Sequence, residues 1–299
     1  MTPIEHARLS LDGLSVGDSF GQRFFGPADI VMKFINKRIL PEPPWYMTDD
    51  SIMAIGITEV LEKCGKIDQD ELAKTFAENY MKSPMRGYGR MAHNILREMS
   101  SGGDWRKIST EVFSGMGSFG NGGAMRVAPL GAYFSGDLDK AAEQAKMSAE
   151  VTHAHPEGQA GAIAVAVAAA FISSSEKKPD QSHAKEILDT VIKLTPDGET
   201  RSGIIRASNL PLSSPVERAV RILGNGSKIS APDTVPFCLW CVARHIDNYE
   251  DALWTTVSGF GDRDTTCAIV GGIVSLSTGI NGIPDNWINS RESLTSWSR

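Results

Sequence analysis

Two acid-rich segments lie immediately before apolar runs that are typical of buried helices, and they restrict how this chain can fold. Asp262 and Asp264 precede the run at residues 267–276, and residues 48–51 open a second apolar segment far upstream. Each cluster is expected at or just before the first turn of a helix. The fold must therefore accommodate two helix starts that are crowded with carboxylates and hydroxyls.

Helix capping accounts for either cluster taken alone. Ser, Thr and Asp are preferred N-cap residues, and acids in a first turn interact favourably with the helix dipole. A cap needs only one such residue, however, and neighbouring acids repel one another. Carboxylate and hydroxyl oxygens are suitable ligands for Mg²⁺, Mn²⁺ or Ca²⁺ rather than for zinc. We therefore predict that the two clusters converge on one site that holds two such ions.

The rest of the sequence predicts an all-α protein with a compact, bundle-like core. Apolar residues recur at helical spacing along most of the chain, whereas strand-like alternation is scarce and no βαβ unit is evident. No linker, repeat or low-complexity tract divides the chain, so residues 1–299 are expected to form one domain. The expected helices cover residues 14–25, a segment from residue 50 onward, 71–81, 91–99, 104–113, 139–152, 159–172, 182–194, 215–223, 234–245, 250–259 and 265–279.

Gly17 and Gly21, in the expected helix at residues 14–25, have the spacing that allows two helices to approach closely. Asp18 lies between them and is expected to be at least half-buried, so its carboxylate needs a partner. Support of a metal ligand is one such role, and contact with the N-terminus of another helix is a second. The sequence leaves both alternatives open.

The composition argues against several classes of protein. The net charge is −6 and no cluster of Lys and Arg is present, which argues against a nucleic-acid partner. The first ten residues lack the apolar core of a signal peptide. The apolar run at residues 160–172 is too short and too rich in alanine to span a membrane. We therefore expect a cytoplasmic, monomeric protein with no membrane partner.

Cys238 and Cys241 form a single C-x-x-C pair within an apolar segment. Zinc binding or redox chemistry is one interpretation, but no second pair completes a zinc site. Free cysteine is among the most buried residue types, so packing inside a helical core is the better interpretation.

A glycine-rich loop follows the expected helix at residues 104–113. Gly115, Gly117 and Gly120 match the G-x-G-x-x-G spacing, but no βαβ unit surrounds them, so a Rossmann site is not indicated. Glycine still lets backbone N–H groups approach a phosphate closely, which makes this loop a candidate diphosphate cradle. A flexible surface turn is the competing interpretation.

Polar and aromatic side chains near the loop favour a binding role. Ser118 and Asn121 add hydrogen-bonding groups, and Phe113 and Phe119 place aromatic rings where a nucleotide base can stack. His153 lies at the end of an expected helix, where a histidine also suits the helix dipole. Its alternative role is a neutral hydrogen bond to a phosphate or a ribose.

Six segments occur in an order that resembles the ADP-ribosylglycohydrolase family. They are GDSFG at residues 17–21, TDDS at 48–51, RGYG at 86–89, SFGNGGAMRVAPLG at 118–131, THAHPEGQAGA at 152–162 and GDRDTTCAIVGGI at 261–273. No single segment is decisive, but the ordered set is highly specific and spans nearly the whole chain. The resemblance implies a compact orthogonal helical bundle with two Mg²⁺ ions, or sometimes Mn²⁺, in a cleft.

The resemblance also implies an activity and a set of functional residues. Such enzymes hydrolyse the bond between C1″ of the distal ribose of ADP-ribose and a protein side chain or another acceptor. The expected partner is therefore an ADP-ribosylated protein or a small molecule that contains ADP-ribose. The implied metal ligands are Thr48, Asp49, Asp50, Asp262, Asp264 and Thr265, and the implied catalytic base is Asp49 or Asp50. The implied substrate-binding residues are Phe113, Gly117, Ser118, Phe119, Gly120, Asn121, Gly122 and His153.

Two departures from the family pattern bear on the reaction. Ser51 replaces a threonine that often follows the paired aspartates, and it keeps a hydroxyl. Members that act on serine-linked ADP-ribose carry a glutamate shortly after the GD pair, whereas residues 22–25 contain no acid and the next is Asp29. The choice between arginine, serine and another acceptor stays open. The alternatives are a relative that binds ADP-ribose without turnover, and a hydrolase of a free ADP-ribose ester or of ADP-ribosylated nucleic acid.

Overall fold

The computed structural model describes residues 1–175 and 181–296, and within these residues the chain is built from α-helices. The described backbone also contains short 3₁₀ turns and isolated bridges, but no strands. The prediction of an all-α protein is confirmed. The helices are α1 (Pro3–Gln22), α2 (Ala28–Asn36), α3 (Asp49–Cys64), α4 (Gln69–Lys82), α5 (Arg90–Ser100), α6 (Trp105–Gly115), α7 (Ala128–Tyr133), α8 (Leu138–Glu150), α9 (Pro156–Ser173), α10 (Ala184–Leu194), α11 (Glu199–Asn209), α12 (Val216–Leu223), α13 (Ala231–Arg244), α14 (Tyr249–Val257), α15 (Arg263–Thr278) and α16 (Asp285–Ser290).

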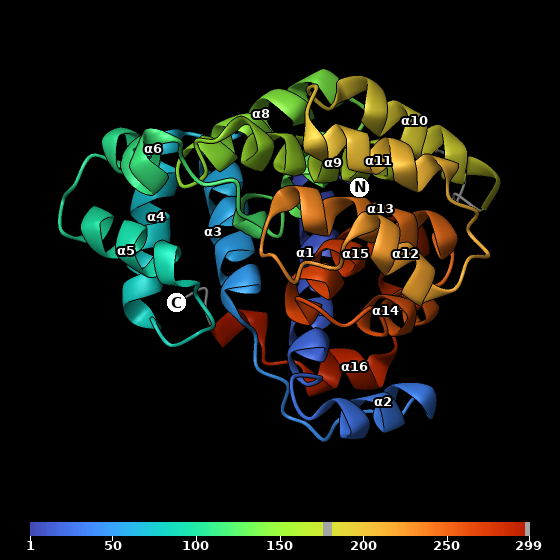
Figure 1. Ribbon diagram of the computed structural model, residues 1–299. Helices are drawn as coiled ribbons and strands as arrows, with labels where there is room; N and C mark the ends of the chain where they lie inside the picture. The colour runs from blue at the N-terminus through green and yellow to red at the C-terminus, as the bar shows by residue number, and fades with distance from the viewer. Residues whose placement is uncertain (176–180, 297–299) are drawn as a thin grey trace.

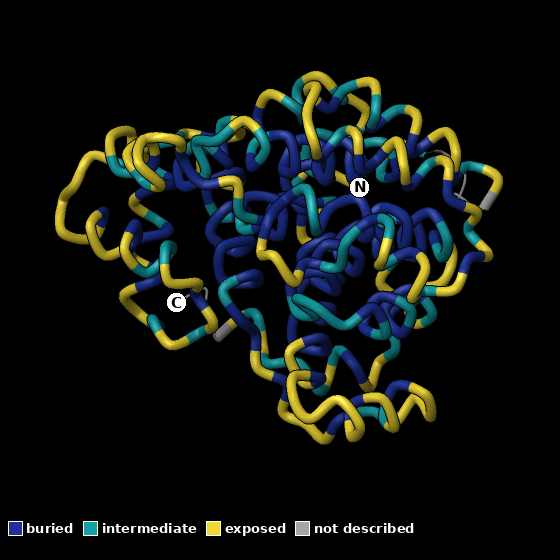
Figure 2. The backbone as a smooth tube through the Cα atoms, viewed as in Figure 1, coloured by how far each residue is buried: buried dark blue, intermediate teal, exposed yellow. Residues whose placement is uncertain are grey.

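α1 and α15 pack side by side at the centre of the molecule, and the other helices surround them (Figure 1). α3 and α7 also pack on α1, while α9 and α14 pack on α15. α4, α5 and α6 lie beyond α3, at the left of Figure 1. Buried residues are concentrated around the two central helices, and the outer helices carry most of the exposed ones (Figure 2).

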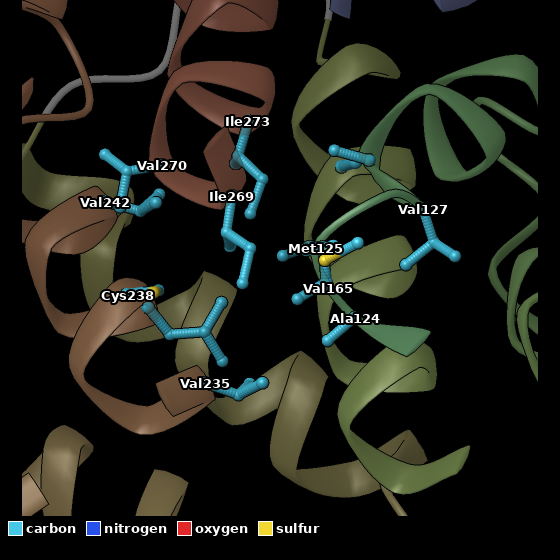
Figure 3. Close-up of a cluster of buried hydrophobic side chains, with 14 of the residues drawn as sticks. Ala124, Met125, Val127, Val165, Val235, Cys238, Val242, Ile269, Val270 and Ile273 are labelled. Carbon is cyan, nitrogen blue, oxygen red and sulfur yellow. The ribbon is translucent and has the colours of Figure 1, made fainter. Parts of the chain in front are cut away.

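α9 is apolar on every side because it runs through the core, in contact with α8, α10, α13 and α15. It is long and apolar enough to cross a membrane, yet 72% of it is buried inside the protein. Such burial is typical of the core helix of a globular protein. Val165 of α9 belongs to the same apolar cluster as Val235 of α13 and Ile269 of α15 (Figure 3).

The two cysteines of the C-x-x-C pair are part of this core. Cys238 is drawn with the apolar cluster in Figure 3, and Cys241 is likewise buried. Both are free thiols. Burial raises the pKa of the Cys238 thiol well above its usual range and that of Cys241 to about 12. A thiol in this state is inert, so the packing interpretation is confirmed.

Glycine lets the backbones of α1 and α15 approach closely. A methyl group on Gly17 would overlap the carbonyl oxygen of Cys267, and one on Gly21 would overlap that of Arg263. Gly271, in α15, likewise leaves room for the backbone of α1. The predicted close packing at Gly17 and Gly21 is confirmed, and the partner helix is the one that begins with the second acidic cluster.

Some helix boundaries differ from those expected. α1 begins at Pro3 rather than near residue 14, because Thr2 and Glu5 form a reciprocal capping box before its first turn. α6 loses helical geometry at Val112, Phe113 and Ser114, the last two having φ angles of 53° and 60°. The loop that follows therefore starts earlier than the apolar periodicity predicts.

The periodicity does not predict α2, α7, α11 or α16. α11 shows the reason, because its first turn is capped from another helix. The carboxylate of Glu157, in α9, accepts hydrogen bonds from the backbone N–H groups of Glu199 and Thr200 at 2.6 and 2.9 Å. No local pattern reveals a cap whose donor and acceptor lie more than forty positions apart.

Replacing Gly17 with alanine is expected to lower the free energy of unfolding by about 1–3 kcal/mol, because the added methyl group would push α1 away from α15. Urea or thermal unfolding of the purified protein measures the change. Gly26→Ala is the matched control, since a methyl group there meets only Val31 Cγ2, at 3.7 Å. A Gly17→Ala protein as stable as the wild type would contradict the close-packing argument.

Candidate functional site

The first turns of α3 and α15 line the same pocket, which has a volume of about 430 Å³. Asp49 and Asp50 reach it from α3, while Asp262, Asp264 and Thr265 reach it from the start of α15. The structure thus brings together two acidic helix starts that lie more than two hundred positions apart in the chain, as their matching composition predicts. Their role as metal ligands stays a prediction.

Asp18 fixes the start of α3 from the neighbouring central helix. Its carboxylate accepts hydrogen bonds from the backbone N–H and the hydroxyl of Thr48, at 2.8 and 2.6 Å. It also accepts from the backbone N–H of Ser51, at 3.3 Å, and from the Ser51 hydroxyl. Of the two roles left open by the sequence, contact with a helix N-terminus is confirmed. The hydroxyl of Ser51 keeps this contact, so the serine at this position preserves the local structure.

Asp49 and Asp50 differ in what they contact. The backbone N–H of Asp49 donates to the carbonyl oxygen of Arg86 at 2.7 Å, and its side chain faces the pocket. Asp50 is buried, with Oδ2 placed 2.9 Å from the Thr48 hydroxyl. Its Oδ1 is also buried and has no hydrogen-bond partner among the described residues. A buried carboxylate oxygen without a donor is costly unless a cation or another ligand approaches it.

The start of α15 is held from the glycine-rich loop. Asn121 Nδ2 donates to Asp262 Oδ2 at 2.7 Å, and Asp264 Oδ1 accepts from the backbone N–H of Thr265 at 2.9 Å. Asp262 occupies the N-cap position but makes no side-chain capping bond. Thr48 does cap α3, through a 3.4 Å contact with the backbone N–H of Asp50. Helix capping therefore explains the presence of Thr48, but it does not explain why several aspartates lie at these two helix starts.

The carboxylates at this site repel one another in a dry environment. Burial, together with the charges of Asp18 and Asp262, raises the pKa of Asp49 to about 8. Burial and the charges of Asp18 and Asp264 raise the pKa of Asp50 well above its usual range. Burial and the charge of Asp262 do the same for Asp264. These groups hold negative charge at neutral pH only when positive charge is supplied to them.

The donor set suits a hard divalent cation. Its oxygens belong to carboxylates and to the hydroxyl of Thr265, and Asp50 Oδ1 has no hydrogen-bond partner in the part of the chain that the structure describes. As the side chains stand, the described residues do not gather three His, Cys, Asp or Glu groups around a single point. The chemistry of the residues therefore fits Mg²⁺ or Mn²⁺. The two ions stay a prediction.

The glycine-rich loop borders the acids and is fixed by contacts on both sides. Gly117 has a φ of 74°, and a methyl group there would lie 2.7 Å from the backbone nitrogen of His155. Gly120 donates its N–H to Ser118 Oγ at 3.2 Å, and the carbonyl oxygen of Phe119 accepts from the backbone N–H of Ala231 at 3.0 Å. Close approach and left-handed backbone thus explain the glycines better than flexibility does.

Several of the predicted substrate-binding residues line the pocket together: Phe113, Ser118, Phe119, Gly120, Asn121, Gly122 and His153. Gly117 is not among the lining residues and lies against the backbone of Ala154 and His155. Phe113 and Phe119 are 44% and 41% exposed, so both aromatic residues at this pocket are accessible to solvent. Phe113 holds a left-handed backbone conformation that is unfavourable for a non-glycine residue. Such strain at a pocket is typical of a functional loop, and the binding roles themselves stay predictions.

A family model described as ADP-ribosylglycohydrolase matches residues 1–298 of this chain. The chain belongs to the ADP-ribosylglycohydrolase family. The ADP-ribosylhydrolase ARH3 of Homo sapiens is 29% identical over 278 residues, which cover 83% of this chain and 75% of that protein. ARH3 of Bos taurus is 31% identical over 272 residues, which cover 82% and 74%. A solved structure described as an ADP-ribosylglycohydrolase-related protein complex has a TM-score of 0.69 and 20% identity, and the match covers 99% of this chain and 95% of that one.

The family assignment confirms what the ordered motifs predict. The solved structure shares the helical fold, and the prediction of a hydrolytic enzyme of the ADP-ribosylglycohydrolase family is confirmed. At 20% identity the structural likeness bears on the fold and not on the chemistry. The segments that meet at the pocket come from the start of α3, the glycine-rich loop and the start of α15.

An ion pair with the C-terminal segment supports the site, and the sequence alone does not predict it. Both guanidinium Nη atoms of Arg86 donate to the carboxylate of Glu292, at 2.7 and 2.8 Å. Arg86 also donates to the carbonyl oxygen of Met47, and its own carbonyl accepts from the Asp49 N–H. This pairing therefore holds the backbone on both sides of Thr48. In the sequence, the RGYG motif points to Arg86, whereas no motif points to Glu292.

The buried acids predict an unusual dependence of stability on pH in the absence of metal. In the presence of a chelator, the free energy of unfolding should fall by at least about 1 kcal/mol as the pH rises from 5 to 8. The sign follows because the unfolded carboxylates ionise near pH 4, whereas native Asp49 keeps its proton up to a pKa of about 8. Mg²⁺ should raise the melting temperature more at pH 8 than at pH 5, since binding requires deprotonated ligands.

Calorimetry of the wild type and of Asp264→Asn, each with EDTA or MgCl₂, checks this expectation. The variant carries a neutral side chain at every pH, so with EDTA its advantage in stability over the wild type should be larger at pH 8 than at pH 5. The pKa of His153 is lowered to about 3, which acts in the opposite sense below pH 6.5 and is common to both proteins. An equal Mg²⁺ effect at the two pH values would refute the metal site.

Proposed function

We propose that this protein is a Mg²⁺-dependent ADP-ribosylhydrolase. It would cleave the N- or O-glycosidic bond between C1″ of the distal ribose and a modified protein side chain, and so reverse ADP-ribosylation. The observation that carries the proposal is the convergence of the acidic starts of α3 and α15 beside the glycine-rich loop and two exposed aromatic rings. The relatives named ADP-ribosylhydrolase ARH3 support it.

The lining of the pocket supports a particular orientation of ADP-ribose. A volume of about 430 Å³ is in the range of small-molecule sites. In this orientation the adenine stacks on Phe113 and Phe119 and the diphosphate lies against the glycine-rich loop. The side chains that would hydrogen-bond to the diphosphate and the ribose are Ser118, Asn121 and His153. The distal ribose then reaches the acids of α3 and α15.

Hydrolysis needs a base, because cleavage at C1″ develops oxocarbenium character and a water molecule must lose its proton. Asp49 is suited to this role, since its carboxylate faces the pocket. Asp50 is the alternative base. The residues that would hold Mg²⁺ are Thr48, Asp49, Asp50, Asp262, Asp264 and Thr265. Bound Mg²⁺ supplies positive charge that orients the ribose hydroxyls and lowers the pKa of a water molecule.

A second candidate is a relative that binds ADP-ribose without hydrolysing its conjugates. The segment after GDSFG favours it, because residues 22–25 contain no acid where the family resemblance leads us to expect a glutamate. Arg263 Nη1 donates to the carbonyl oxygen of Phe24 at 2.6 Å, and its guanidinium lies 4.6 Å from the centroid of the Phe25 ring. An acceptor other than a protein, such as a free ADP-ribose ester or ADP-ribosylated nucleic acid, is a variant of the main proposal. A monomeric state and a cytoplasmic location stay part of that proposal.

Asp264→Ala is expected to abolish turnover and leave the helical fold intact, because the change removes a ligand from an open site. The assay is release of ADP-ribose from arginine-linked, serine-linked and DNA-linked conjugates, each with Mg²⁺ or with EDTA. Circular dichroism tests the fold of the variant. Asp139→Ala, in the first turn of α8, is the matched control because it removes an acid from a helix start outside the pocket.

Each outcome of this assay decides between the candidates. Release that a chelator does not reduce would exclude the metal-dependent mechanism. Binding of ADP-ribose with no release from any conjugate would identify the non-hydrolysing relative. Unfolding of Asp264→Ala, with Asp139→Ala folded, would show that the acid serves mainly to start α15.

Phe119→Ala should weaken the affinity for ADP-ribose by about 1–3 kcal/mol if the adenine stacks on this ring. Isothermal titration calorimetry with free ADP-ribose measures the difference. Phe25→Ala serves as the control, since Phe25 is similarly exposed, at 46%, and does not line the pocket. Equal affinities for the wild type and Phe119→Ala would remove this residue from the base-binding site.

A further inference from the structure

Arg126 is a completely buried cation that borders the pocket between the glycine-rich loop and α7. Its Nη2 donates to the carbonyl oxygen of Ser148 and to Thr152 Oγ1, at 2.9 Å in each case. Its guanidinium also lies 4.6 Å from the centroid of the Phe76 ring. A charge buried to this degree is tolerated only where such partners hold it, so these contacts fix the position of the group.

Thr152 connects Arg126 to His153. The Thr152 hydroxyl oxygen lies 2.7 Å from His153 Nδ1. A guanidinium can only donate, so this hydroxyl accepts from Arg126 and keeps its single proton to give. His153 Nδ1 is the other polar atom that the described structure places against the hydroxyl. The buried proton is satisfied when it points at Nδ1, which makes Nδ1 the acceptor.

This direction of the hydrogen bond decides the form of the imidazole. A neutral histidine that accepts at Nδ1 carries its proton on Nε2. The ring is neutral at physiological pH, because burial and the charge of Arg126 lower the pKa of His153 to about 3. Nε2 faces the glycine-rich loop, since a methyl carbon placed on Gly122 or Gly120 would lie 3.1 or 3.2 Å from it. The N–H group is therefore directed at the space beside that loop.

We propose that Arg126 and Thr152 are positioning residues that hold His153 as the Nε2–H tautomer, and that this N–H donates to a phosphate oxygen seated in the glycine-rich loop. The inference deepens the proposed function and rests on it for the identity of the ligand, the diphosphate of ADP-ribose. The opposite tautomer would present a lone pair to the phosphate oxygens and repel them.

Arginine is suited to this task because it has no acceptor atom. A neutral partner such as glutamine could accept from the Thr152 hydroxyl, which would allow the hydrogen bond to reverse and the tautomer to change. Arg126 permits one direction only. Burial lowers the pKa of Arg126 to about 9, so the guanidinium still carries its charge at neutral pH. The positive charge next to His153 also opposes a second proton on the imidazole.

The tautomer can be read directly, with no ligand present, from the ¹⁵N chemical shifts of the imidazole in protein labelled at histidine. His153→Gln identifies the His153 signals among those of the six histidines. At pH 7 we expect the Nε2–H form in the wild type and in Thr152→Ser, which keeps the hydroxyl. Thr152→Val keeps the shape without the hydroxyl and should give a mixture of tautomers. A wild-type Nδ1–H form would overturn the proposal.

Calorimetric titration with ADP-ribose and with adenosine tests the consequence for binding. Thr152→Val should bind ADP-ribose about tenfold more weakly, the effect of losing one hydrogen bond to a charged group. Its affinity for adenosine, which has no phosphate, should be unchanged, and Thr152→Ser should bind both ligands as the wild type does. Thr195→Val controls for the loss of a buried hydroxyl, because Thr195 Oγ1 bonds to the carbonyl oxygen of Val191 outside the pocket. Equal weakening for both ligands, or none, would refute the positioning role.

The two measurements separate this inference from the proposed function. A wild-type protein with the Nε2–H tautomer and no affinity for ADP-ribose would refute the proposed function and the phosphate assignment, and would leave the control of His153 by Arg126 and Thr152 in place. A protein that binds ADP-ribose with His153 in the other tautomer would refute that control and leave the proposed function intact.

Discussion

The close packing of α1 against α15 is the constraint on which the site depends. Gly17 and Gly21 place one side of α1 against the backbone of α15, and Asp18, the next residue after Gly17, reaches the start of α3 from another side. A single central helix therefore sets the distance between the two acidic helix starts. A site mounted in this way on packed helices keeps its geometry better than one built on loops.

The buried carboxylates of the site lower the stability of the fold. Burying carboxylates is costly unless donors or cations compensate them. Asp18 is compensated, because it accepts from the backbone and hydroxyl groups of Thr48 and Ser51. Asp50 is not, because one of its oxygens is buried without a partner among the described residues. The uncompensated charge is concentrated at the pocket, where a cation would relieve it, and this pattern is typical of a site under selection for function.

Local sequence signals are sufficient for most helices and for the acids of the site, but not for contacts made across the chain. α3 and α15 follow from apolar runs that begin with acids, and the ordered motifs identify the family. α11 is not predictable in this way, because Glu157 caps it from a distant helix. Glu292 has no local pattern, and Arg126 lies in a recognisable segment that does not reveal its role. The partners that give these two residues a role lie 206 and 26 positions away.

The pairing of Arg86 with Glu292 has a consequence for the order in which the protein is assembled on the ribosome. The loop that supports Asp49 is synthesised early, but the carboxylate that secures it emerges 206 residues later. α15, which carries the other acids, also belongs to the last part of the described chain. The acids of α3 are therefore synthesised about two hundred residues before those of α15. The same late helix completes the apolar core around α1, so the burial of the core and the approach of the mutually repelling carboxylates belong to one late step.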